Sequence, residues 1–234
     1  MTRERWNGMI IGLLYIVAAV SSVIAVVLYQ PILSDQWVMS VANGYEPKIL
    51  MGVFNDLILV MAVIGTAVML FPYLRHWNEH IALGYLCFRF MEAVFIAIGL
   101  VGILGLLYLS SFYETGELSD VDLQAVGFML QSFHRWTFML GPNLMLGLNT
   151  VLYSYIFLKT GLVPKPLAIF GIITAVMVFL AGILDMFGII VPISTVKGFL
   201  ALPVGLYEMT LAVWLIVQGF HKQSFIDLKE IRKR

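Results

Sequence analysis

Six long apolar runs fill most of this 234-residue chain and leave only short segments between them. Each run is at least as long as the roughly 20 residues with which an α-helix crosses the hydrocarbon core of a bilayer. Because backbone groups in hydrocarbon must find hydrogen bonds within their own segment, the runs predict helices. We expect an all-α, polytopic membrane protein, in which a six-transmembrane-helix bundle forms a single domain over residues 1–234. The predicted spans are about 7–29, 49–74, 81–111, 124–158, 166–190 and 194–219.

The composition agrees with a membrane protein and argues against other classes. Apolar residues make up 61% of the chain and charged residues 12%, whereas apolar residues are about half of a soluble domain. This composition makes the lipid bilayer the expected partner. No basic stripe with interleaved aromatic residues is present in the sequence, so no nucleic acid is expected as a partner. The single cysteine, Cys87, lies in an apolar run, which argues against a disulfide or a thiolate-clustered metal site.

Lysine and arginine residues are distributed unevenly between the two sides of the predicted spans. Only Lys48 and Lys197 fall on one side, and the acidic loop at 114–122 lies on that side as well. Because basic residues accumulate in cytoplasmic loops, both termini are expected inside, in the cytoplasm. The ten basic residues that support this orientation are Arg3, Arg5, Arg75, Lys159, Lys165, Lys222, Lys229, Arg232, Lys233 and Arg234.

The first run has features of both a cleavable signal peptide and a membrane anchor. Arg3 and Arg5 precede it, as they would in a signal peptide. The apolar run continues to Leu28, however, which is longer than a signal h-region, so we expect an anchor. Gly8 and Gly12 give this helix a face of small residues against which another helix can pack closely.

Ionisable side chains inside the apolar runs mark where function is expected. Each costs roughly 2.5 to 3.5 kcal/mol to place at a membrane helix centre, so it is seldom kept without a partner or a role. Counting about 1.5 Å per residue along each helix spreads these side chains from the outer part of the bundle to just below its middle. We expect one polar track, whose predicted binding residues are Asp56, Arg89, Glu92, Gln131, His134, Arg135, Asp185 and Glu208.

Helical spacing predicts which of these side chains face the interior of the bundle. At 100° per residue, five residues of the fourth predicted helix fall within about one third of its circumference and form a polar stripe. They are Gln131, His134, Arg135, Pro142 and Asn149. Pro142 also predicts a kink or break within that run, because proline lacks a backbone N–H. On the last helix Glu208 shares a face with the small residues Ala201, Gly205 and Ala212. Small residues let two helices approach closely, so we expect another helix to pack against this face.

The charges inside the runs do not balance. Four acids, Asp56, Glu92, Asp185 and Glu208, stand against two bases, Arg89 and Arg135. A low-dielectric interior does not tolerate two excess negative charges, so one or two acids are expected to be protonated at neutral pH, or His134 charged, or a cation bound. The alternative is that these residues are ion pairs that serve helix packing alone.

Two histidine patterns are candidates for a metal site, and no metal is expected at either. His76, Glu79 and His80 match the H-x-x-E-H zinc motif, but they lie in a short inner loop without an evident third ligand. His134 beside Gln131 is more typical of a hydrogen-bonded packing residue than of a ligand. The sequence indicates no particular cofactor.

Three short stretches resemble a bacterial membrane family known as domain of unknown function 4386. They are Phe88-Arg-Phe-Met-Glu-Ala93, Gly161-Leu-Val-Pro-Lys-Pro-Leu-Ala-Ile-Phe-Gly171 and the helix from Leu202 to Gly219. The family's arginine and glutamate on the third helix match Arg89 and Glu92, and its glutamate on the last helix matches Glu208. The resemblance extends over nearly the whole chain, implies the same number and order of spans, and supplies no reaction.

Three functions fit these observations. The first is binding, or proton-coupled transport, of a small ligand or cation at a buried polar site in the outer half of the bundle. The second is an intramembrane enzyme that acts on a lipid or isoprenoid, with His134 or an acid as general acid–base and Arg135 holding an anionic head group. The third is a non-catalytic accessory subunit whose partner is another membrane protein.

The predicted orientation can be tested directly. A reporter that is active only in the cytoplasm should be active when fused at the carboxyl terminus and inactive when inserted in the acidic loop at 114–122, because the basic residues should hold the termini inside. Activity at both positions would contradict the orientation.

Overall fold

The computed structural model describes residues 3–115, 119–190 and 195–221, and helices are the regular elements of that part of the chain. Five helices are long and apolar enough to cross a membrane. They are α1 (Arg3–Leu28), α3 (Glu46–Leu74), α4 (Glu79–Thr115), α7 (Lys165–Met186) and α8 (Thr195–Val217). The all-helical prediction is confirmed for the described residues.

The fourth predicted run forms three consecutive segments in place of one uniform helix. They are α5 (Asp120–Phe138), the π-helix η2 (Met139–Met145) and α6 (Leu146–Thr160). Pro142 lies inside η2, where the wider turn accommodates a residue that cannot donate a backbone hydrogen bond. The break predicted at this proline therefore takes the form of a π-helix. α6 ends at Thr160 and is followed by Gly161, whose φ of 67° is left-handed.

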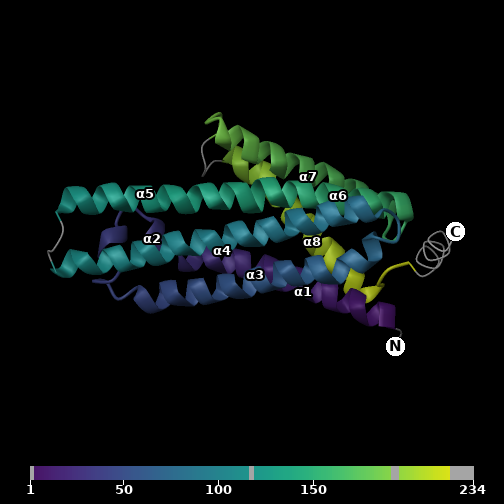
Figure 1. Ribbon diagram of the computed structural model, residues 1–234, viewed down its shortest axis with the longest axis horizontal. Helices are drawn as coiled ribbons and strands as arrows, with labels where there is room; N and C mark the ends of the chain where they lie inside the picture. Colours follow the sequence, from purple (N-terminus) through teal and green to yellow (C-terminus); the bar gives the residue numbers. More distant parts are fainter. Residues whose placement is uncertain (1–2, 116–118, 191–194, 222–234) are drawn as a thin grey trace.

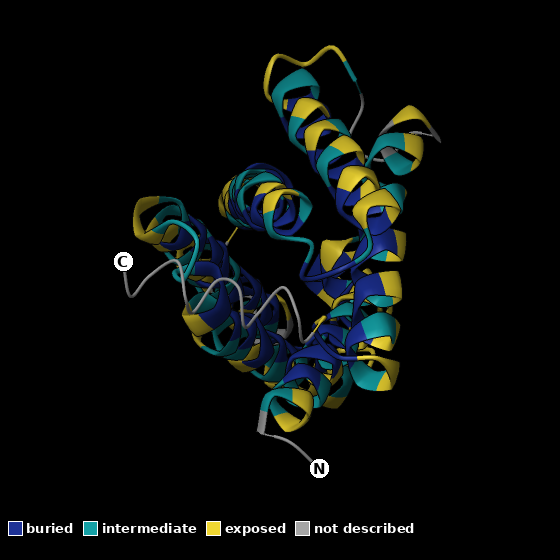
Figure 2. Cartoon of the chain, turned by 90° about the vertical axis from the view of Figure 1, so that its right-hand side faces the viewer, coloured by how far each residue is buried: buried dark blue, intermediate teal, exposed yellow. Residues whose placement is uncertain are grey.

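The helices pack in a closed ring. α1 lies against α3 and α8, α4 lies against α3 and α6, and α7 lies against α6 and α8. α5 packs along α4 outside this ring (Figure 1). Figure 2 shows that buried residues line the sides on which the helices meet, while exposed residues cover the outside. Many of the exposed residues are large and apolar, for example Phe54, Val101 and Leu206.

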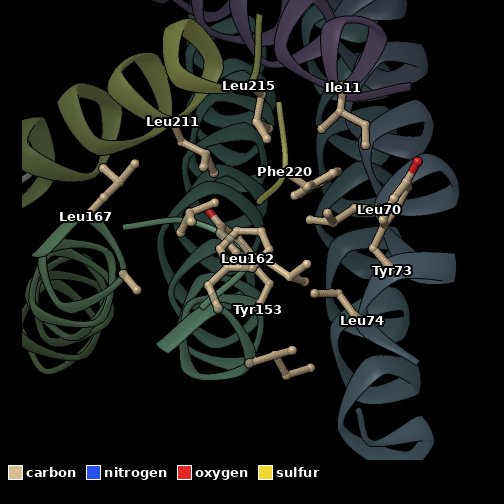
Figure 3. Close-up of a cluster of buried hydrophobic side chains, with 14 of the residues drawn as sticks. Ile11, Leu70, Tyr73, Leu74, Tyr153, Leu162, Leu167, Leu211, Leu215 and Phe220 are labelled. Carbon is tan, nitrogen blue, oxygen red and sulfur yellow. The ribbon is translucent and has the colours of Figure 1, made fainter. Parts of the chain in front are cut away.

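Both described chain ends lie at the same end of the bundle, together with the α3–α4 and α6–α7 turns (Figure 1). Arg5 and the last residue of α8 are joined there, because the Arg5 guanidinium donates to the Val217 carbonyl at 2.7 Å. A cluster of buried side chains fills this amino-terminal end (Figure 3), with Ile11, Leu70 and Leu215 among its members.

The opposite end is extended by the α4–α5 pair. At about 1.5 Å per residue, the 37 residues of α4 span about 55 Å, which exceeds the 40–45 Å of a whole bilayer. The short elements α2 (Gln30–Leu33) and η1 (Trp37–Met39) pack against this pair. The Trp37 ring lies directly on Gly127 of α5, and Ser110 of α4 donates to the Val38 carbonyl at 2.9 Å.

Glycines mark where two helices approach most closely. A Cβ added at Gly12 would lie 2.6 Å from the Ala212 carbonyl oxygen of α8, so the small face predicted on α1 does receive another helix. Glu208 faces inward, as its helix face predicted, and is buried. The close contact predicted at Gly205 is wrong, because a Cβ there would have no atom within 4 Å. The α8 contact instead uses the side of the helix around Ala212.

These two glycines form a matched pair for mutation. Gly12→Ala should lower the free energy of unfolding by about 1–3 kcal/mol, because the α1 and α8 backbones must separate to admit the methyl group. Gly205→Ala should be neutral or stabilising by up to about 1 kcal/mol, since alanine favours the helix more than glycine. Thermal unfolding of both variants in the same detergent measures the difference, and equal loss in both would contradict this packing.

Candidate functional site

The centre of the ring holds one arginine between two glutamates. Arg89 Nη1 on α4 donates to Glu92 Oε2 at 3.1 Å and to Glu208 Oε1 on α8 at 3.2 Å. Its Nε donates to the Thr66 hydroxyl on α3 at 3.1 Å. Asn149 of α6 donates to Glu92 Oε2 at 2.8 Å. These five residues, which we call the central polar group, are all buried.

Every helix of the ring reaches this group or the shell around it. The ring of Tyr15, from α1, lies 5.4 Å from the Arg89 guanidinium carbon, within the range of a cation–π contact. Tyr207 of α8 shares a hydrogen bond of 2.8 Å with Ser154 of α6. Gly171 of α7 leaves the space for this pair, because a Cβ there would lie 2.3 Å from the Tyr207 ring. The group is therefore held from all sides by the fold.

The central polar group is not electrically balanced. Two carboxylates face one guanidinium, and both contact the same nitrogen, Nη1. Asn149 and Thr66 contribute hydrogen bonds but no charge. A buried site with one excess negative charge is strongly unfavourable, so a further positive charge is required when both carboxyl groups are ionised.

A second ion pair lies apart from the first. Arg135 Nη2 on α5 donates to Asp185 Oδ1 near the end of α7 at 3.2 Å. The Asp185 side chain is 1% exposed, whereas that of Arg135 is 48% exposed. The inward orientation predicted for Arg135 is therefore wrong. α5 packs on α4 with one side only, and Arg135 lies at the edge of the predicted stripe, where it reaches α7 from the open side.

The other polar residues of the fourth run also have separate partners. His134 Nδ1 lies 3.1 Å from the Gly99 carbonyl oxygen of α4. The Gln131 amide nitrogen lies 3.3 Å from the Ser34 carbonyl oxygen, beyond the end of α1. Only Asn149 reaches the central polar group, and it follows η2, whose wider turn shifts the helical phase. The predicted stripe thus serves several contacts instead of one site.

Asp56 lies on α3 near Tyr29, which follows the carboxyl-terminal end of α1. The single polar track expected from the sequence is divided in the structure, because apolar side chains lie between the levels of Asp56 and Arg89. This cluster, which we call the apolar plug, comprises Ala18, Leu59, Ala62, Val63 and Ala93. The predicted site residues therefore do not form one site. Arg89, Glu92 and Glu208 lie in the central polar group, Arg135 pairs with Asp185, and Asp56, Gln131 and His134 lie apart from both.

Metal ligands are not grouped in the part of the chain that the structure describes. Within those residues no three His, Cys, Asp or Glu side chains come together in a way that could hold a metal ion. His76 lies in the α3–α4 turn, while Glu79 and His80 begin α4. The absence of a metal site remains a prediction.

Two apolar grooves lie on the outside of the bundle. One, of about 460 Å³, lies between α1 and α3 and includes Leu28, Phe54 and Asn55 among its lining residues. The other, of about 540 Å³, lies along α8 near Trp214. Neither groove is lined by a predicted site residue.

Thr66 and Tyr15 belong to the site although the sequence analysis did not select them. Thr66 is a common residue in an apolar helix, and only the fold shows that it bonds Arg89. Thr66 follows Asp56 by ten residues, which at 100° per residue places the two about 80° apart around the helix, so the helical period is only a weak signal for Thr66.

The central polar group predicts a specific mutational pattern. Arg89→Met should destabilise the protein by about 3–5 kcal/mol, because it leaves two buried carboxyl groups without their cation. Adding Glu92→Gln and Glu208→Gln to that variant should restore much of the loss, since no charge then remains. The yield of monodisperse protein and its thermal unfolding measure both effects. An Arg89→Met variant as stable as the native chain would contradict the pairing.

Comparison with known proteins agrees with the resemblance seen in the three short stretches. No curated protein and no solved structure matches the chain. The family described as domain of unknown function (DUF4386) matches residues 10–219, which include all five residues of the central polar group. The chain therefore belongs to the DUF4386 family.

Proposed function

We propose that the chain is a six-span protein of the bacterial cytoplasmic membrane with both termini inside. Five helices have the length and apolar character of spans, and α5, η2 and α6 together supply the sixth. Arg5, Arg75, Lys159 and Lys165 belong to the amino-terminal end of the bundle, and Lys48 to the opposite end, which supports a cytoplasmic location of the amino-terminal end.

We further propose that the protein couples binding of a small cation to release of a proton at the central polar group. The observation that carries this proposal is the contact of two buried carboxyl groups with one guanidinium nitrogen. Such a group is neutral when it holds Arg89 and one additional positive charge. A proton on either glutamate supplies that charge, and so does a bound monovalent cation.

A proton on one glutamate and a bound cation exclude one another, and this exclusion couples cation binding to proton release. When a cation binds beside Glu92 and Glu208, the proton leaves, because both would give the site a net positive charge in a low-dielectric interior. When the cation leaves, a proton returns. The same carboxyl groups thus exchange one positive charge for another.

Exchange from a buried site requires that helices move, and η2 is suited to this role. π-helical turns are local departures from the α-helix that occur frequently at functional sites. Gly141 of η2 lies against α4 directly at the Glu92 level, since a Cβ there would be 3.2 Å from the Glu92 carbonyl oxygen. A change of pitch in η2 would therefore act on the α4 segment that carries Glu92.

Transport measurements in proteoliposomes test the proposal. The liposomes have an acidic interior and contain a pH-sensitive dye, and Na⁺, K⁺ or tetramethylammonium is added outside. At least one of these cations should raise the internal pH faster than in protein-free liposomes, and Glu92→Gln and Glu208→Gln should abolish the effect.

Glu79→Gln is the matched control, because Glu79 is an exposed acid at the start of the same helix as Glu92. It should exchange at the native rate. If none of the three cations changes the internal pH, or if Glu92→Gln and Glu208→Gln exchange as the native protein does, the buried charges serve packing and the proposal is wrong.

A further inference from the structure

Asp56 is a buried acid that the central polar group does not use. It is 5% exposed, and its Oδ1 atom makes no hydrogen bond. Among the residues that the structure describes, no cationic side chain forms an ion pair with it. An ionised carboxyl group in such a place would be uncompensated, and this is strongly unfavourable in a low-dielectric interior.

The fold provides one polar neighbour for this carboxyl group. The Tyr29 hydroxyl group, also buried, lies near it, and like Asp56 Oδ1 it makes no hydrogen bond in the structure. Gly52, one helical turn before Asp56, admits the tyrosine, because a Cβ there would lie 2.6 Å from the Tyr29 ring. The small residue on α3 therefore fixes the position of the hydroxyl group relative to the acid.

His134 is the other titratable side chain near this place. Its ring lies edge-on to the Tyr29 ring, with 6.0 Å between the ring centres. Its Nδ1 is occupied by the Gly99 carbonyl oxygen at 3.1 Å. His134, which belongs to α5, thus packs against the Tyr29 ring. It forms no ion pair with Asp56 among the contacts of the described chain.

The apolar plug separates Asp56 from the central polar group. Thr66, which bonds Arg89, follows Asp56 by ten residues on the same helix, a rise of about 15 Å. Leu59, Ala62 and Val63 of the plug lie in this interval and pack against Ala18 and Ala93. The two acidic places are therefore separate sites with an apolar layer between them.

We propose that Asp56 and Tyr29 form a second proton-binding site, on the outer side of the apolar plug. In the protonated state the Asp56 carboxyl group is neutral and donates its hydrogen to the Tyr29 oxygen. When the proton leaves to water on the outer side, the Tyr29 hydroxyl donates to the carboxylate that remains. The step is a proton transfer alone, and no other bond forms or breaks.

This inference takes the outer side from the proposed orientation, but it goes beyond the exchange proposed at the central polar group and does not depend on that exchange. It adds a site that takes protons at the outer side, so the protein would bind protons at two levels. The plug prevents a single proton from being shared between the levels without movement of the helices.

Infrared spectroscopy of the full chain in lipid bilayers tests this site. A protonated carboxyl group has a carbonyl stretching band distinct from that of a carboxylate. A band of this kind should be lost in Asp56→Asn, should remain in Glu208→Gln, and should remain in Asp35→Asn, whose exposed acid lies in the outer segment. Tyr29→Phe should keep the band but shift its frequency, because the carboxyl group loses its hydrogen-bond partner.

The Tyr29→Phe spectrum keeps the test decisive if Asp56→Asn does not fold. An Asp56 carboxyl band that is absent at neutral pH, or one whose frequency is the same in Tyr29→Phe and in the native chain, overturns the proposal. These spectra are independent of transport, so a failure of cation exchange in proteoliposomes leaves their outcome unchanged.

Discussion

The contact of Arg89 with two carboxyl groups is the interaction on which the rest of this structure depends. It joins α4 to α8 through Glu208, and Thr66 and Asn149 extend it to α3 and α6. Helices that surround such a group must exclude water and also approach closely, which explains the small residues at the α1–α8 and α7–α8 contacts, Gly12 and Gly171. The ring is closed around a charge that could not be left unpaired.

The excess of two negative charges counted in the sequence has a location in the structure. One belongs to the central polar group, where two glutamates share one arginine, and the other belongs to Asp56. Asp185 does not contribute, because Arg135 balances it from the open side of α5. The charge imbalance is thus divided between two levels of the bundle, with the apolar plug between them.

The sequence predicted the helical class, the family and the inward face of Glu208, because these depend on local composition and helical period. It did not predict which residues share a site, since that depends on which helices are neighbours in the ring. Asp56 and Arg89 were expected in one track, but their separation by the plug follows from the packing of α1, α3 and α4. The prediction that Arg135 faces inward is wrong for a related reason, because the helical period cannot show that α5 lies outside the ring.

The protonation state of the central glutamates is the most direct measure of this account. Solid-state NMR of the protein in lipid bilayers, with ¹³C-labelled glutamate side chains, separates protonated from ionised carboxyl carbons, and Glu92→Gln and Glu208→Gln assign the signals. In the absence of a binding cation at neutral pH, one of these two glutamates should be protonated and the other ionised. Two ionised carboxyl groups beside Arg89 under those conditions would contradict the account.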